Sequence, residues 1–191
     1  MIEQILSFLL EVVAGLVSGA CLLRLYMQAQ RVPFNNPVGQ LVFALSDWLV
    51  MPLRKLIKPA GKYDMSSLLA AIIIQLLHYV LLWALTGASA SPLMIPLLAV
   101  FGLLRMVLTG LVGLLIVYAI LSWVSPHSPI YGVMARLCQP LLRPVQRVVP
   151  LVGGVDLSPL VVLIVLQVLL MVLGHVQYSV LSTVPSVMNG L

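Results

Sequence analysis

Four polar side chains interrupt long apolar runs, and their chemistry needs an explanation. Glu11 lies in the first run, Gln75 in the second, Arg105 in the third and Gln167 in the fourth. A charge or an amide in hydrocarbon is costly unless it finds a partner. These residues therefore predict either contacts between helices or a polar path across a membrane. Both interpretations remain open for Gln75 and Gln167, which we expect near the bilayer centre.

Two Asp-x-Ser sequences, Asp64-Met-Ser66 and Asp156-Leu-Ser158, stand directly before apolar runs. Asp and Ser accept hydrogen bonds from the free N–H groups of a first helical turn. We predict that they cap two helices at the membrane surface. The alternative is that each carboxylate holds a basic side chain, such as Lys55 or Arg147.

Basic residues cluster just before each Asp-x-Ser sequence. Clusters of this kind beside membrane spans bind anionic phospholipid headgroups. We predict that a lipid- or partner-binding surface includes five of them, namely Arg54, Lys55, Lys58, Arg143 and Arg147.

No catalytic or cofactor signature is present. The chain lacks GxSxG, HExxH, a carboxylate pair and a phosphate-binding glycine loop. Cys21 and Cys138 have no metal-binding spacing; Cys138 is a candidate for acylation, and burial is the alternative. His78 and His175 differ by about 7 Å in expected depth, which disfavours joint haem ligation. We expect no enzyme activity, metal or cofactor.

The segment from Pro37 to Gln75 recurs at Pro129 to Gln167, without a gap, at a shift of 92 residues. Leu and Val matches mean little in so apolar a chain, so the less common matches carry the argument. They pair Pro52 with Pro144, Gly61 with Gly153, Asp64 with Asp156, and Ser66 with Ser158. The sequence therefore predicts two repeats, at residues 1–88 and 89–191.

The repeat shift places Glu11 two residues from the counterpart of Arg105, so both should lie at similar depth. We predict that they form an ion pair between the two halves. The alternative is that both lie nearer the outer surface and extend their charged ends to water.

The composition requires lipid as part of the solvent. Of 191 residues, 62% are hydrophobic and only 8% are charged, whereas soluble domains have about 25% charged residues. Runs of about 20 apolar residues span a bilayer as helices. We predict an all-α membrane protein with four spans, over residues 2–26, 66–86, 97–123 and 158–180. No Lys or Arg precedes Arg24, so we expect the first run to be a retained anchor rather than a signal peptide.

Two shorter segments predict amphipathic helices in the membrane interface, over residues 37–51 and 129–142. In the first, Val38, Leu41, Val42, Leu45 and Trp48 form a helical stripe. Asn36 is a predicted N-cap before Pro37. Ser46 and Asp47 fall on the polar side, and Pro52 should end the helix.

The placement of the ten basic residues predicts the topology. They lie in the repeat connections, at the adjoining end of the first span, and at Arg105; none lies in the N-terminal stub, residues 86–93 or the tail. The net charge of +5 thus indicates positive-inside loops and no nucleic-acid partner. We predict cytoplasmic connections, termini on the outer side, and two parallel repeats about a pseudo-twofold axis along the membrane normal.

The sequence Pro140-Leu-Leu-Arg-Pro-Val-Gln-Arg-Val-Val-Pro150, followed by Gly153-Gly-Val-Asp-Leu-Ser-Pro159, resembles the signature of the YggT family. These are small bacterial integral membrane proteins with plastid relatives. The first repeat departs from the pattern, with Met51 opposite Arg143 and Lys62-Tyr63 opposite Gly154-Val155. We therefore expect the second copy to carry the motif's role.

The resemblance implies a role in division, envelope organisation, osmotic-stress tolerance or, in plastids, cytochrome b6f assembly, with no established enzymatic activity. We expect a non-catalytic scaffold or assembly factor of the bacterial inner membrane. Its expected partners are phospholipid, a membrane protein and a second copy of itself. The alternative is a transporter or channel component with a polar intramembrane path.

Overall fold

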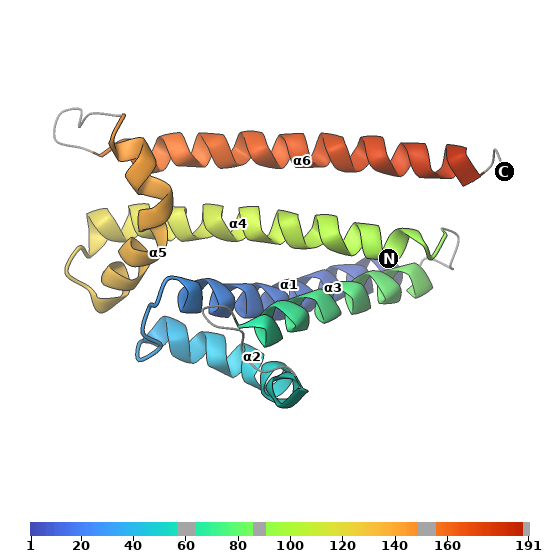
Figure 1. The fold of residues 1–191 in the computed structure, drawn as a ribbon, viewed down its shortest axis with the longest axis horizontal. Coiled ribbons are helices and arrows are strands. Elements are labelled where there is room, and N and C mark those ends of the chain that lie inside the picture. The colour runs from blue at the N-terminus through green and yellow to red at the C-terminus, as the bar shows by residue number, and fades with distance from the viewer. Residues whose placement is uncertain (57–63, 86–90, 149–155, 189–191) are drawn as a thin grey trace.

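A computed structural model describes residues 1–56, 64–85, 91–148 and 156–188 of the chain. Within these ranges the chain is helical and contains no strand, which confirms the predicted all-α class (Figure 1). The elements are α1 (Ile2–Ala29), α2 (Pro37–Leu56), α3 (Met65–Leu85), α4 (Met94–Val124), α5 (Pro129–Gln146) and α6 (Ser158–Met188). The predicted boundary between residues 88 and 89 lies outside the described residues.

The four long helices α1, α3, α4 and α6 are apolar and long enough to cross a bilayer. They lie side by side; α5 crosses one end of the group, and α2 runs obliquely from that end along α1 and α3 (Figure 1). In each half a long helix, a short helix and a second long helix follow in the same order and directions. The predicted four spans, two amphipathic helices and parallel repeats are therefore confirmed.

Proline does not end the amphipathic helices, so that prediction for Pro52 is wrong. Helix α2 continues through Pro52 to Leu56, and α5 contains both Pro140 and Pro144. Each proline lacks the N–H that would bond the carbonyl four residues earlier. Because these prolines are exposed, water or headgroups can supply the missing hydrogen bonds. In α4, Pro96 falls in the first turn, where no N–H bond is lost.

Both amphipathic helices begin with a matching side-chain cap. The Gly39 N–H donates to Asn36 Oδ1 at 2.9 Å, and the Tyr131 N–H donates to Ser128 Oγ at 3.1 Å. Asn36 and Ser128 are 92 residues apart, so the repeat preserves the cap position although the residue differs. The predicted N-cap at Asn36 is confirmed.

The two halves meet at the end where α2 and α5 lie. One apolar cluster joins α1 and the residues after it to both amphipathic helices; its buried members are Met27, Val32, Val42, Val133, Met134 and Leu137. Tyr26 Oη on α1 also donates to the Leu137 carbonyl on α5 at 2.7 Å.

Packing between the halves is not reciprocal. Helix α3 packs on α4, and α1 also touches α4, whereas the described part of α6 packs on α4 and α5. The twofold relation between the repeats is therefore inexact, and the outer faces of α6 and α1 do not cover each other.

Candidate functional site

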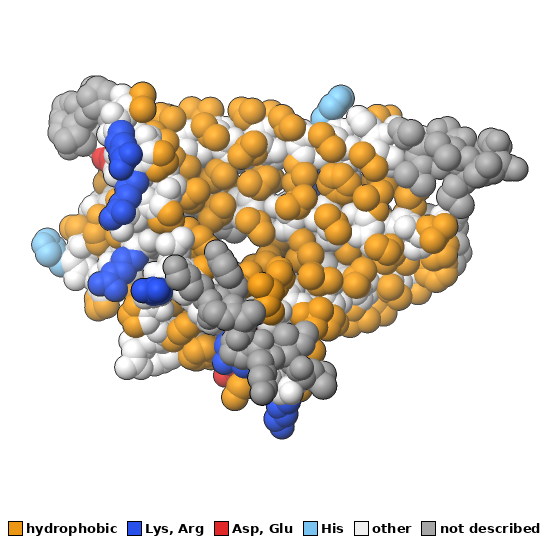
Figure 2. Space-filling model, in the orientation of Figure 1, with side chains coloured by type: hydrophobic (Ala, Val, Ile, Leu, Met, Phe, Trp, Pro, Cys, Tyr) orange, Lys and Arg blue, Asp and Glu red, His pale blue; other side chains and the backbone are white. Residues whose placement is uncertain are grey.

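Basic side chains gather over α5 and the adjoining chain at one end of the molecule and continue along α2 toward its far end (Figure 2). We call this the basic end. Its exposed described cations are Arg31, Lys55, Arg136, Arg143 and Arg147. The chain enters and leaves α5 at this end, and α2 also begins there (Figure 1). Lys58, another predicted site residue, lies outside the described residues.

A second group of charges is buried just inside the basic end, centred on Arg24 of α1. The Arg24 guanidinium donates from Nη1 to Asp47 Oδ1 at 2.6 Å and to Ser46 Oγ at 3.0 Å. Its Nε lies 3.7 Å from Asp64 Oδ2. Its Cζ lies 4.7 Å from the centroid of the Phe43 ring, a cation–π distance. Arg24 is only 2% exposed, so these contacts replace its water.

Asp64 closes this group from the start of α3. Its Oδ2 accepts hydrogen bonds from Arg54 Nη2 and from Ser67 Oγ, the latter at 2.9 Å. Burial alone would raise the pKa of Asp64, but the bonds from Arg54 and Ser67 and the charges of Arg54 and Arg24 outweigh it and lower the pKa. Asp64 is therefore a carboxylate at neutral pH.

We call Arg24, Asp47, Arg54 and Asp64 the charged cluster. Two guanidiniums and two carboxylates balance its charge, and its members come from α1, α2 and the residue before α3. The cluster thus fastens the amphipathic helix to two spans. Since each of its ionised groups contacts an opposite charge, the cluster has a structural role.

The second repeat keeps the geometry of this cluster without most of its charge. At the shift of 92 residues, Ile116 replaces Arg24, Gln139 replaces Asp47 and Gln146 replaces Arg54. Gln146 Nε2 donates to Asp156 Oδ2 at 2.8 Å, which reproduces the bond from Arg54 to Asp64. An apolar cluster, including Cys138 and Leu142, fixes α5 instead.

The two Asp-x-Ser sequences have different roles. Asp156 Oδ1 accepts the Ser158 N–H at 2.9 Å, so the capping prediction is confirmed there. Burial alone would raise the pKa of Asp156. The hydrogen bonds from Ser158 and Gln146 outweigh burial, so the pKa is lowered. The described hydrogen bonds of the Asp64 carboxylate come from the side chains of Arg54 and Ser67. The capping prediction is therefore wrong for Asp64. The alternative, in which the carboxylate holds a basic side chain, applies there with Arg54 as the partner. Ser66 and Ser158 are both fully buried.

The predicted binding residues therefore divide into two groups. Arg54 is held in the charged cluster, whereas Lys55, Arg143 and Arg147 are exposed and belong to no described ion pair. The first repeat holds the buried charges, and among the described exposed cations of the basic end Arg136, Arg143 and Arg147 belong to the second repeat. That the second copy carries the motif's role stays a prediction.

Gln75 and Gln167 occupy opposite environments despite their matching positions. Gln75 on α3 is 4% exposed, and its Nε2 lies 3.4 Å from Ser18 Oγ of α1. The contact lies within the first repeat, and Gln75 also reaches Gly102 of α4 in the second. Gln167 is exposed on α6 and has no hydrogen bond within the described part of the chain.

Glu11 and Arg105 do not form the predicted ion pair in the described structure. The ion pairs found among the described residues all belong to the charged cluster. Both side chains are exposed, and both lie within electrostatic range of Tyr79 on α3. The pairing prediction is wrong because it considered depth alone. Positions two residues apart on a helix lie about 200° apart around its axis, so similar depth does not give a shared face.

The histidines and cysteines form no shared centre in the described structure. His78 lies half-buried on α3 and His175 is exposed on α6, and these helices do not pack together. Both cysteines are buried, and burial raises the pKa of the Cys138 thiol to about 12. Cys138 is therefore an inert core thiol rather than an acylation site.

Arg24 and Asp47 belong to one site, which the sequence patterns above do not predict. Those patterns indicate only the topology for Arg24 and a polar helix face for Asp47. A usable signal was present: the chain has only five acidic residues, and Asp47 and Asp64 both follow Arg24 at the same predicted membrane surface. When a chain has so few acidic residues, those that lie at the same depth as a buried arginine are its expected ion-pair partners.

The fold and site define a class: a four-span helical membrane protein built from two parallel repeats with a basic end. The CCB3/YggT family model matches residues 3–85 and 97–177, and the chain belongs to this family. An uncharacterised YggT protein of Escherichia coli is 37% identical over 177 residues, covering 90% of each chain. An uncharacterised protein of Vibrio alginolyticus is 33% identical, over 90% of this chain and 94% of its own. An uncharacterised protein of Pseudomonas aeruginosa is 32% identical, over 85% of this chain and 84% of its own. No solved structure matches.

Proposed function

We propose that the protein is a non-catalytic scaffold of the bacterial inner membrane, which binds anionic phospholipid headgroups and a membrane-protein partner through its basic end. The observation that carries the proposal is the separation of charges at that end. The inner charges neutralise one another, whereas the outer cations are exposed (Figure 2).

The exposed cations favour an anionic surface. Arg31, Lys55, Arg136, Arg143 and Arg147 leave the basic end with an excess of positive charge. Each Lys or Arg near a membrane surface contributes about 1 kcal/mol of attraction to anionic lipid. This contribution is modest for one residue and substantial for five that act together.

The amphipathic helix α2 supplies an apolar contact beside these charges. Leu41, Trp48 and Met51 are 61%, 61% and 54% exposed. Such a face enters the acyl boundary of one leaflet, and Trp favours headgroup depth. We infer a cytoplasmic position for the basic end from the positive-inside rule, with the termini on the outer side.

The polar intramembrane residues give little support to the transport alternative. Gln75 is enclosed by α1, α3 and α4, whereas Gln167 is exposed on the outside of α6. A cavity of about 600 Å³ lies between α1 and α4, but apolar residues and glycines line almost all of it. An ion would find few ligands there.

The test compares lipid retention in three proteins: wild type, a triple variant with Arg136, Arg143 and Arg147 changed to Gln, and a matched triple with the same residues changed to Lys. Each is reconstituted in nanodiscs of mixed anionic and zwitterionic phospholipid. The anionic lipid that remains bound after detergent extraction is quantified by mass spectrometry. We expect the Gln triple to retain about fivefold less than wild type or more, and the Lys triple to retain most of it.

Equal retention by wild type and the Gln triple would contradict the lipid proposal. The protein partner is tested separately by affinity capture from native membranes with both triples. Specific capture by wild type and the Lys triple alone supports the scaffold. Ion flux in reconstituted liposomes, with no captured partner, would favour the transport alternative instead.

A further inference from the structure

Helix α6 carries a stripe that includes polar side chains, on a face that no described helix covers. Gln167, Met171, His175 and Tyr178 follow one another at helical spacing, and all are exposed. Met171 and Tyr178 are 73% and 74% exposed. Apolar side chains can face lipid, but an amide and an imidazole inside a span call for partners.

The first repeat shows what covers the equivalent face. At the shift of 92 residues, Gln167 corresponds to Gln75 and Met171 to Tyr79. In α3, Gln75 and Tyr79 press against Gly102 of α4. A Cβ placed on Gly102 would lie 2.9 Å from Tyr79 Oη and 3.2 Å from Gln75 Oε1. The face is therefore a close helix-packing surface in the first repeat.

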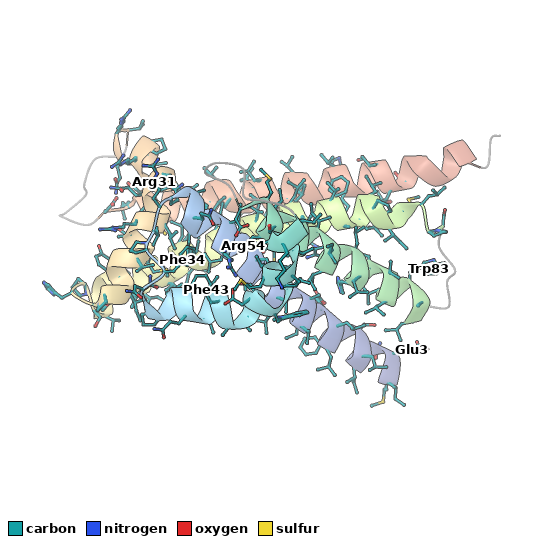
Figure 3. The ribbon with its side chains drawn as sticks, turned by 60° about the horizontal axis from the view of Figure 1, so that its bottom comes forward. Glu3, Arg31, Phe34, Phe43, Arg54 and Trp83 are labelled. Atoms are coloured by element: carbon teal, nitrogen blue, oxygen red, sulfur yellow. The ribbon has the colours of Figure 1, made fainter. Side chains whose placement is uncertain are left out.

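The same shift identifies the counterpart of the α4 surface. The α4 surface contains the buried residues Ile95 and Ala99 and also Gly102. Their counterparts on α1 are, in the same order, Glu3, Ser7 and Leu10. This part of α1 is largely exposed. In Figure 3 the end of α1 that carries Glu3 diverges from α6. The repeat thus leaves two matching faces, on α6 and on α1, which do not meet within one chain.

We propose that a second copy of this chain covers both faces, with α6 of each copy packed antiparallel on α1 of the other. The result is a closed twofold dimer with two equivalent contacts. The register of α3 on α4 places Gln167 beside Leu10 and Glu11, and His175 beside Ser7 and Glu3. An amide and an imidazole on one helix then meet hydroxyl and carboxylate groups on the other.

A second copy fits this surface better than an unrelated protein, because the chain already contains the matching contact between α3 and α4. The polar residues also complement one another: α6 supplies Gln167 and His175, and α1 supplies Glu3, Ser7 and Glu11. The proposal is independent of lipid binding at the basic end: α6 begins beside α5 but runs to the opposite end of the molecule, where α1 begins (Figure 1).

The test is cross-linking in native membranes between two differently tagged, co-expressed chains, one with Leu10→Cys and the other with Gln167→Cys. The native thiols are buried, so they can remain. After treatment with a short bismaleimide, we expect a product that carries both tags. Leu169→Cys is the matched control at the same depth, because it lies about 200° around α6 from Gln167 and is also exposed.

Each outcome decides the proposal. A product from Gln167→Cys chains alone would show a symmetric α6–α6 contact and overturn it, as would equal linking through Leu169→Cys or no linking. Gln167→Leu provides a second measurement, by the dimer fraction of purified protein in detergent. Loss of the amide should weaken dimerisation roughly three- to twentyfold; an unchanged or increased dimer fraction would contradict a paired Gln167.

Discussion

At the scale of single residues, Arg24 is buried and stabilises the fold, although the sequence indicates only its role in the topology. We predict that Arg24→Ile lowers the free energy of unfolding by about 3–5 kcal/mol, because Asp64 stays buried after losing one of its cations. Thermal unfolding in detergent measures the effect. Arg143→Ile, at an exposed position, should change it by less than about 0.5 kcal/mol.

The second repeat supplies a matched control for this prediction. The triple variant Arg24→Ile, Asp47→Gln and Arg54→Gln copies the residues found 92 positions later, where Gln146 alone holds Asp156. It should be more stable than Arg24→Ile alone, since it also removes the charges that lost their partner. A lower melting temperature for the triple variant than for Arg24→Ile would contradict the prediction. It would show that the neutral residues of the second repeat cannot replace the charged cluster.

The two aspartates should respond differently to the loss of charge. Asp64→Asn leaves two guanidiniums facing each other, whereas Asp156→Asn can still accept the Ser158 N–H. We predict a loss of about 2 kcal/mol or more for the first and less than about 1 kcal/mol for the second. Thermal unfolding of both variants at neutral pH checks the prediction, and equal losses would contradict it.

The pH dependence follows from the lowered pKa of Asp64. A carboxyl whose pKa is lower in the folded than in the unfolded protein stabilises the fold above its ordinary value of about 4. That contribution disappears as the pH falls through the folded pKa. The difference in melting temperature between wild type and Asp64→Asn should be constant between about pH 5 and 8 and should narrow below about pH 4. A constant difference through pH 3 would contradict this assignment.

At the scale of helices, glycine substitutions separate close packing from open surface. A Cβ at Gly102 would lie 3.0 Å from the Tyr79 ring, whereas one at Gly110 would meet nothing within 4 Å. Gly102→Val should lower stability by about 1–3 kcal/mol through overpacking between α3 and α4. Gly110→Ala should be neutral or stabilising by up to about 1 kcal/mol, because alanine favours helix. Thermal unfolding distinguishes them, and equal stability would contradict the close contact.

The sequence predicted the helices better than it predicted their faces. Observed and predicted starts agree for α2, α5 and α6, because Pro37, Pro129 and Ser158 stand at recognisable starts. In α2, however, Leu41 and Trp48 of the predicted apolar stripe are exposed, and Ser46 is fully buried against Arg24. A helix between lipid and protein is apolar on both sides, so hydrophobic periodicity cannot identify the buried side.

At the scale of the whole molecule, the repeat predicted the architecture but not the site. Matching prolines and aspartates indicated two parallel units, which the structure confirms. The site depends on what differs between the units. Arg24, Asp47 and Arg54 have neutral counterparts, so a search for matching residues passes over them. A mismatch across a repeat marks where one copy has specialised.

The burial of Arg24 also has a consequence for how the protein is made. Asp47 and Asp64 follow Arg24 by 23 and about 40 residues. At about 5–20 residues per second, the guanidinium waits on the order of seconds for its partners to be synthesised. During that time it can extend from the end of α1 to the headgroups, which fixes the direction in which α1 enters the membrane. One residue thus first orients the nascent chain and later holds its finished fold together.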